Sequence, residues 1–122
     1  MEFTLGLILF LLFIHWFCDF VLQTHKMAVN KSSSFKWLVL HTLVYSSVFF
    51  LLLLFSHKSK IYDVFIFSLI TFFFHTITDF ITSKVNKYFW EQGDTHNFFV
   101  SVGFDQLLHY IQIFVTYQII FL

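Results

Sequence analysis

Residues 3–22 read FTLGLILFLLFIHWFCDFVL, an apolar run that carries a histidine and an aspartate in its second half. A membrane helix needs about 20 mostly apolar residues to cross a hydrocarbon core about 30 Å thick, because each residue advances the helix by about 1.5 Å. Three further runs of this kind lie at residues 35–55, 61–82 and 98–122. The sequence therefore predicts an all-α membrane protein, with one domain over residues 1–122 and four transmembrane helices in an up-down bundle.

The composition of the whole chain agrees with this prediction. Of its 122 residues, 58% are hydrophobic and only 11% are charged, which is too apolar for a soluble domain of this size. The formal net charge is zero and arginine is absent, so no basic surface is available to hold nucleic acid by its phosphates. The lipid bilayer is the predicted partner, and a homo-oligomer is compatible with the sequence.

Polar connectors separate the apolar runs, and their lysines predict an orientation. Long connectors lie at residues 23–36 and 84–97, and a short hydrophilic turn, SHKSK, lies at residues 56–60. The two long connectors contain five lysines and the short turn contains two. By the positive-inside rule, the long connectors are predicted to face the cytoplasm and both termini to lie outside.

Each apolar run also contains two polar side chains spaced four residues apart, which places both on one face of a helix. An ionisable side chain in a membrane helix costs roughly 3 kcal/mol, so it usually points into the bundle and marks a functional site. The pairs are His15 and Asp19, His41 and Tyr45, His75 and Asp79, and Asp105 and His109.

The depth of these pairs predicts that they meet. In an up-down bundle, the ends of the first and third helices lie beside the starts of the second and fourth. His15 and His75 lie near helix ends, whereas His41 and Asp105 lie near helix starts. All of the pairs therefore fall in the leaflet nearest the two long connectors, and we expect them to form a single cluster there.

Four imidazoles and three carboxylates in an apolar surrounding suit divalent metal, one or two ions of zinc, manganese or iron. Carboxylates both neutralise such ions and bridge them. The predicted ligands are His15, Asp19, His75, Asp79, Asp105 and His109. His41 is predicted as a ligand or general acid, and Tyr45 as a proton donor or substrate contact. Gln23 and Lys31 are expected at the mouth, where they would receive an anionic head group.

This pattern favours a metal-dependent hydrolase that acts on a lipid or another amphiphile with a phosphoester or acyl bond. A proton or divalent-cation transporter is an alternative, although the ionisable residues occupy one leaflet only. Bis-histidine haem binding is another, but buried aspartates are hard to explain beside a haem. The last alternative is a non-enzymatic interaction protein whose polar cluster fixes helix packing.

Residues of the first connector follow directly on the pair of the first apolar run. Together with the pairs of the other three runs, they form a longer motif. The combination is His15-x3-Asp19-Phe20-x2-Gln23-Thr24-x2-Met27-Ala28-x2-Lys31, His41-x3-Tyr45, His75-x3-Asp79 and Asp105-Gln106-x2-His109. It resembles, over nearly the whole chain, a bacterial and phage membrane family known as domain of unknown function 3307. The resemblance implies a fold, a polar cluster, and a place in the bacterial inner membrane or a phage-encoded equivalent. A looser similarity in style links the chain to membrane-bound metal-dependent hydrolases.

Overall fold

The structure is a computed structural model that describes residues 2–56 and 59–122. Within these ranges the chain is helical and contains no strand, which confirms the predicted all-α class. A π-helical segment, η1, continues the first helix directly. The elements are α1 (Leu5–Trp16), η1 (Phe17–Val21), α2 (His25–Asn30), α3 (Phe35–Ser56), α4 (Ile61–Glu91) and α5 (Thr95–Phe121).

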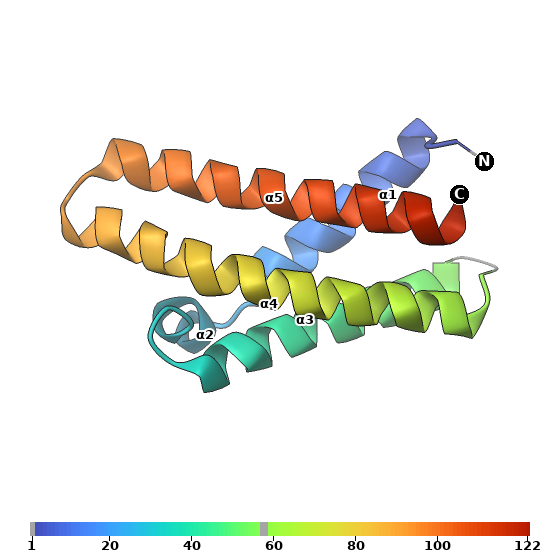
Figure 1. The fold of residues 1–122 in the computed structure, drawn as a ribbon, viewed down its shortest axis with the longest axis horizontal. Helices are drawn as coiled ribbons and strands as arrows, with labels where there is room; N and C mark the ends of the chain where they lie inside the picture. Colours follow the sequence, from blue (N-terminus) through green and yellow to red (C-terminus); the bar gives the residue numbers. More distant parts are fainter. Residues whose placement is uncertain (1, 57–58) are drawn as a thin grey trace.

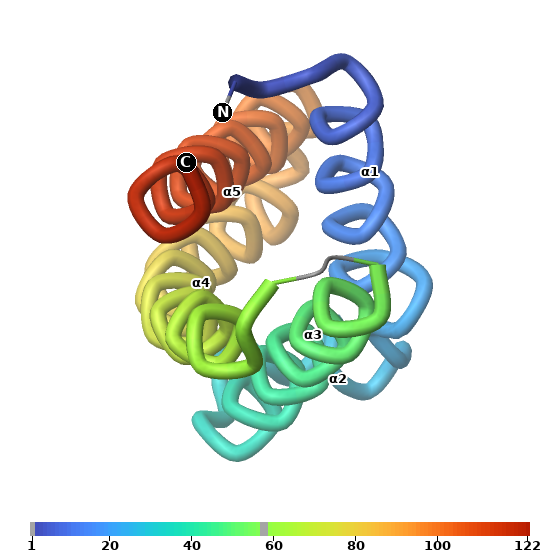
Figure 2. Tube along the Cα trace, turned by 90° about the vertical axis from the view of Figure 1, so that its right-hand side faces the viewer, coloured from blue at the N-terminus to red at the C-terminus, as the bar shows by residue number. Residues whose placement is uncertain are grey.

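The long helices α3, α4 and α5 run side by side in alternating directions, and α1 crosses them obliquely (Figure 1). Viewed from the end, α1, α3, α4 and α5 surround a common centre, while the short helix α2 contacts α3 (Figure 2). Both chain ends lie at the same end of the bundle, where the rings of Phe3 and Phe114 meet edge to face at 5.5 Å.

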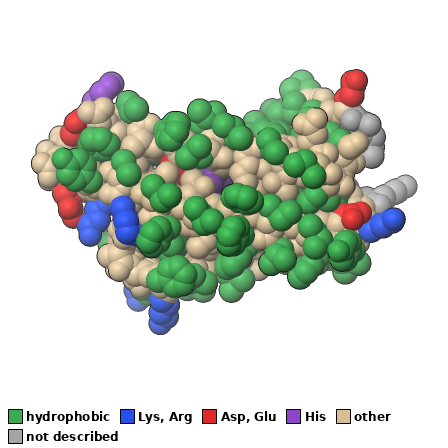
Figure 3. All heavy atoms as spheres, viewed as in Figure 1, with side chains coloured by type: hydrophobic (Ala, Val, Ile, Leu, Met, Phe, Trp, Pro, Cys, Tyr) green, Lys and Arg blue, Asp and Glu red, His purple; other side chains and the backbone are tan. Residues whose placement is uncertain are grey.

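Three helices, α3, α4 and α5, are long and apolar enough to cross a membrane. The first apolar helix, Leu5–Val21, is shorter than these three, so a fourth span is not established by length. Hydrophobic side chains cover the middle of the face in Figure 3, whereas charged side chains gather toward its two ends. This distribution is consistent with an integral membrane protein.

The interior divides into an apolar half and a polar half. The apolar half lies toward the end of the bundle that holds both chain termini, and aromatic rings such as Phe49 and Phe67 pack there at 5.7 Å. Among the described residues, every buried aspartate and histidine lies in the other half, in the cluster described below. The apolar half therefore closes one side of that cluster.

The connector predicted at residues 84–97 is mostly helical. Helix α4 continues to Glu91, and α5 begins at Thr95, so only residues 92–94 form the turn. The extension contains no glycine or proline, and Lys87 and Glu91 form an ion pair one helical turn apart. Gly93, with a φ of 69°, makes the turn, as expected of a residue without a β-carbon.

The first connector also contains a helix that the sequence pattern did not indicate. Thr24 caps α2 by accepting a hydrogen bond from the backbone of Met27. A turn follows α2, in which the backbone nitrogen of Ser34 donates a hydrogen bond to the carbonyl oxygen of Asn30. Of the short turn predicted at residues 56–60, residues 57–58 lie outside the described ranges.

Candidate metal centre

The predicted polar pairs meet in the polar half of the bundle. Each long element contributes, because the i,i+4 spacing presents both members of a pair to the bundle axis. Each of these residues is between 0 and 6% exposed. They are His15 of α1, Asp19 of η1, His41 and Tyr45 of α3, His75 and Asp79 of α4, and Asp105 and His109 of α5.

The π-helical segment sets the position of Asp19. Its backbone widens from the α-helical pattern, and the nitrogen of Leu22 bonds the carbonyl oxygen of Phe17, five residues earlier. Such widened turns occur often at functional sites, because one extra residue per turn changes the direction of the side chains that follow. Asp19 is the one candidate ligand carried by such a turn.

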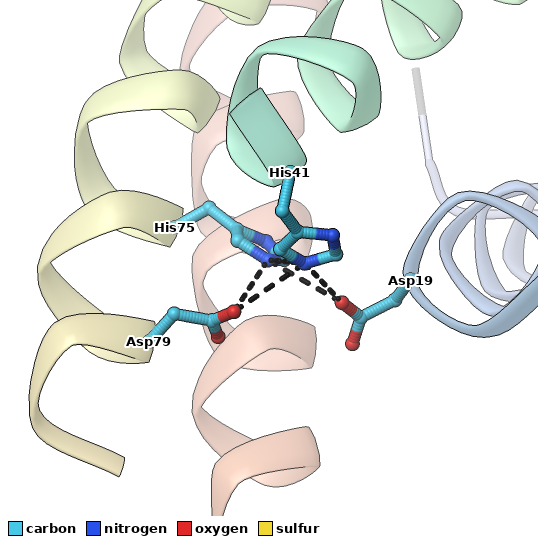
Figure 4. Close-up of side chains that lie close together, drawn as sticks. All are labelled: Asp19, His41, His75 and Asp79. Atoms are coloured by element: carbon cyan, nitrogen blue, oxygen red, sulfur yellow. Dashed lines mark hydrogen bonds and ion pairs between the residues drawn. The ribbon is translucent and has the colours of Figure 1, made fainter. Parts of the chain in front are cut away.

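Four of these residues, Asp19, His41, His75 and Asp79, form the inner group, whose donor atoms converge on one point (Figure 4). His41 Nε2 lies 3.0 Å from Asp19 Oδ1 and 3.3 Å from Asp79 Oδ2. His75 Nε2 lies 3.4 Å and 3.5 Å from the same two oxygens. The two imidazole nitrogens are 3.3 Å apart.

These distances match the edges of a metal-centred tetrahedron. With ligand atoms about 2.0–2.1 Å from zinc, the edges of a regular tetrahedron are about 3.3–3.4 Å long. The inner group therefore fits a divalent cation in both its spacing and its mix of imidazole and carboxylate donors.

A second set, the outer group, consists of Asp19, Asp105 and His109, whose donor atoms lie within 4.8 Å of one another. His109 Nε2 is 3.3 Å from Asp105 Oδ1 and 3.0 Å from Asp79 Oδ1. Asp19 belongs to both groups, and the two oxygens of Asp79 face different groups. The carboxylates therefore join the two groups into one cluster.

Lys31 reaches this cluster from the turn between α2 and α3. Its Nζ donates a hydrogen bond to Asp79 Oδ2 at 2.9 Å, and its side chain is 16% exposed. Burial alone would lower the pKa of Lys31, but the neighbouring carboxylates, Asp79 foremost, raise it above its usual value. Lys31 is therefore a fixed positive charge beside the inner group.

His15 lies in the same network but outside both groups. Its Nε2 is 2.7 Å from Gln106 Oε1, an atom that only accepts, so this nitrogen carries the proton. Its Nδ1 then accepts the hydroxyl proton of Tyr45 at 2.6 Å. Both ring nitrogens of His15 thus have protein partners, and its predicted role as a ligand finds no support in these distances.

Gln106 links His15 to the carboxylates. Its Nε2 donates to Asp19 Oδ2 and to Asp105 Oδ2, at 3.1 Å each. On the other side of Asp105, the hydroxyl of Thr82 donates to Oδ1. These partners hold Asp105 in one orientation, in the manner of the hydrogen bonds that orient metal-binding carboxylates.

A cavity of about 650 Å³ leads from the cluster toward α2 and the turn between α4 and α5. Asp19, Asp105 and Gln106 line its inner end, and neither His41 nor His75 does. The predicted mouth residues also line it: Lys31, together with Gln23, whose Oε1 is buried without a hydrogen-bond partner among the described residues. Tyr45 does not reach this cavity, so its predicted contact with substrate is not supported there.

The sequence matches a known family. Residues 7–122 match DUF3307, a family described as protein of unknown function. The chain belongs to the DUF3307 family. No curated protein and no solved structure matches it.

The i,i+4 pairs did not indicate a role for Gln106 or Thr82 in this DUF3307 protein. Gln106 adjoins Asp105 and lies three residues before His109, so it shares their helix face and was detectable as a further polar side chain on it. The hydroxyl of Thr82 lies 2.9 Å from the carbonyl oxygen of Thr78 in its own helix, and it also reaches Asp105.

Proposed function

We propose that this DUF3307 protein is a membrane metalloenzyme with four transmembrane helices, in which the inner group binds a divalent cation. The observation that carries the proposal is the spacing of the two imidazole nitrogens from each other and from the two carboxylate oxygens, 3.0–3.5 Å, which suits tetrahedral coordination. Zinc, manganese and iron all accept imidazole and carboxylate ligands. The ion would neutralise two carboxylates that are otherwise buried close together.

We propose hydrolysis of an amphiphile as the reaction. A metal ion lowers the pKa of a bound water and stabilises the negative charge that develops on a phosphoryl or acyl oxygen. The cavity supports this reaction because it joins the cluster to Lys31 and Gln23, one a cation and the other an amide with an unpartnered oxygen. These two side chains would hold an anionic head group while the apolar part stays in the lipid.

A transport function receives less support. A path of the proton-relay kind uses ionisable groups along its whole length, whereas the buried ionisable histidines and aspartates of the described residues lie in one half of the bundle. Phe49, Leu53 and Phe67 fill the other half and are fully buried. A site that is closed on one side fits a catalytic function better than a transport function.

A purely structural cluster is the second candidate, and the contact between Lys31 and Asp79 favours it. That ion pair supplies positive charge without any metal, so part of the carboxylate charge is already balanced within the chain. In this case the cluster would fix helix packing, as buried polar groups do in some bundles.

Metal analysis of the detergent-purified protein separates these functions. We expect the parent and Asp63→Asn to contain stoichiometric metal and to hydrolyse members of a lipid-phosphate panel, because Asp63 lies in the first turn of α4, away from the cluster. Asp79→Asn should lose both metal and hydrolysis, since it removes a ligand charge. Preparations without metal would overturn the metal site and support the structural function. Preparations that contain metal but do not hydrolyse the substrates would overturn the enzymatic function and leave the metal site in place.

A further inference from the structure

The outer group differs from the inner group in its access to the cavity. Asp105, which belongs to the outer group alone, and Asp19, which both groups share, line the inner end of the cavity, whereas the other members of the two groups do not. Structural metal sites are closed by four protein ligands, whereas catalytic sites keep three and leave a position for water or substrate. The inner group offers four ligands and the outer group offers three.

We propose that the outer group binds a second divalent cation, and that this ion is the one that meets substrate. This inference rests on the proposed metal-dependent function. It assigns a structural role to the ion of the inner group and the catalytic role to the ion of the outer group. The inner ion, held by four residues, organises the cluster. The outer ion, held by Asp19, Asp105 and His109, keeps a coordination position open to the cavity.

The donor spacing of the outer group supports an ion there. His109 Nε2 and Asp105 Oδ1 are 3.3 Å apart, the edge length expected between two ligands of one tetrahedral ion. Asp105 and His109 are 6% and 1% exposed, so both are shielded from bulk water. Gln106 positions this group from outside by donating to one oxygen each of Asp19 and Asp105.

The two groups share one carboxylate, which allows two ions to bind together. Asp79 turns Oδ2 toward the inner group, and its Oδ1 lies 3.0 Å from His109 Nε2. Asp19 is a member of both groups, so its carboxylate is placed to bridge two ions. Two ions bridged in this way typically lie about 3.5–4 Å apart and stabilise both the attacking and the leaving oxygen of a displacement.

The balance of charge identifies the class of substrate. One divalent ion together with Lys31 neutralises the three carboxylates of Asp19, Asp79 and Asp105. A second divalent ion leaves a surplus of positive charge in an apolar surrounding. An anionic group in the cavity removes that surplus, so a phosphoester fits the loaded centre better than a neutral ester does.

The test uses Mn²⁺ as the probe, because it reports both stoichiometry and the distance between ions. The protein in detergent is stripped with a chelator, reloaded with Mn²⁺, freed of unbound metal, and studied by elemental analysis and electron paramagnetic resonance. We expect two equivalents and an exchange-coupled spectrum for the parent and for the control Asp63→Asn. Asp105→Asn and His109→Gln should each retain one equivalent with the spectrum of an isolated ion.

The outcomes separate this inference from the proposed function. A parent that binds one equivalent, lost in His75→Asn but kept in Asp105→Asn and His109→Gln, overturns the second ion and leaves the metalloprotein intact. A parent that binds none overturns both. Two equivalents that persist in both outer-group variants also overturn the assignment of the second ion to these residues. The two variants change different helix-α5 side chains, so a folding failure of one leaves the other to decide.

Discussion

Lys31 Nζ lies 2.9 Å from Asp79 Oδ2, so an ammonium group contacts the same oxygen that completes the inner group. A lysine here has two opposite effects. It stabilises Asp79 when no metal is bound, and it repels a divalent cation that binds the same carboxylate. The relationship therefore makes Lys31 a means of distinguishing a metal site from a structural ion pair.

Lys31→Gln should raise the affinity of the protein for divalent cations by about tenfold, which corresponds to about 1.4 kcal/mol. The physical reason is that the substitution removes the repulsion but keeps a side chain that can donate to Asp79. Competition against a fluorescent zinc chelator measures the change. A structural cluster predicts a different result: no metal affinity, and a loss of up to about 3 kcal/mol of stability because a buried carboxylate loses its partner.

The same substitution should slow hydrolysis of an anionic substrate. Lys31 lines the cavity, and its raised pKa keeps it charged near the place where a head group would enter. We expect the KM for a phosphoester amphiphile to rise about tenfold, with a smaller change in kcat, because the charge acts mainly on binding. Lys84→Gln is the control, since that lysine bonds the carbonyl oxygen of Phe80 on an exposed face. Equal effects of the two substitutions would show that Lys31 has no specific role in the cavity.

Gln106 should influence metal binding without being a ligand. Gln106→Leu removes donors to Asp19 and Asp105, and we expect a 10–100-fold loss of metal affinity, the usual effect of losing an orienting partner. The matched control is Gln112→Leu, in the same helix. Gln112 bonds Thr71 and Thr116 instead of the cluster, so its loss should affect stability but not metal binding. Titration with Mn²⁺ and thermal unfolding of both variants would measure the two effects separately.

Sequence reasoning found the members of the cluster because an i,i+4 pair in an apolar helix has a definite direction. It could not assign them to two groups, since that depends on the rotation of each helix about its axis. His15 illustrates the difference: it shares the spacing of His75 but faces Tyr45 and Gln106.

The ends of the helices were harder to predict than the cluster. Helix α4 runs nine residues beyond the predicted span, which ends at residue 82, because the helix continues into the polar sequence that follows the apolar run. Apolar length indicates how far a helix can lie in lipid, and it says little about where the helix ends. The π-helical turn at Asp19 cannot be recognised from the amino-acid composition either.

Asp19→Asn should have the largest effect of any single carboxylate substitution, because Asp19 belongs to both groups. If two ions bind, this variant loses both, and it loses the stabilisation that bound metal gives to the folded state. We expect added Zn²⁺ to raise the melting temperature of the parent but not of Asp19→Asn. If the cluster is structural instead, the amide keeps hydrogen bonds while relieving buried charge, and the variant should melt at or above the parent with no response to Zn²⁺ in either protein.

The four-helix topology is tested by the accessibility of the chain ends and of the turn between α4 and α5. The ends of the chain lie together in the structure, and an even number of crossings requires them to face the same side of a membrane. Single cysteines are introduced at Glu2, Asp94 and Leu122 in a Cys18→Ser background and labelled in sealed vesicles with an impermeant maleimide. We expect Glu2→Cys and Leu122→Cys to react from one side and Asp94→Cys from the other. Labelling of Glu2→Cys together with Asp94→Cys, opposite to Leu122→Cys, would show that the shorter helix Leu5–Val21 does not cross, and that only α3, α4 and α5 span the membrane.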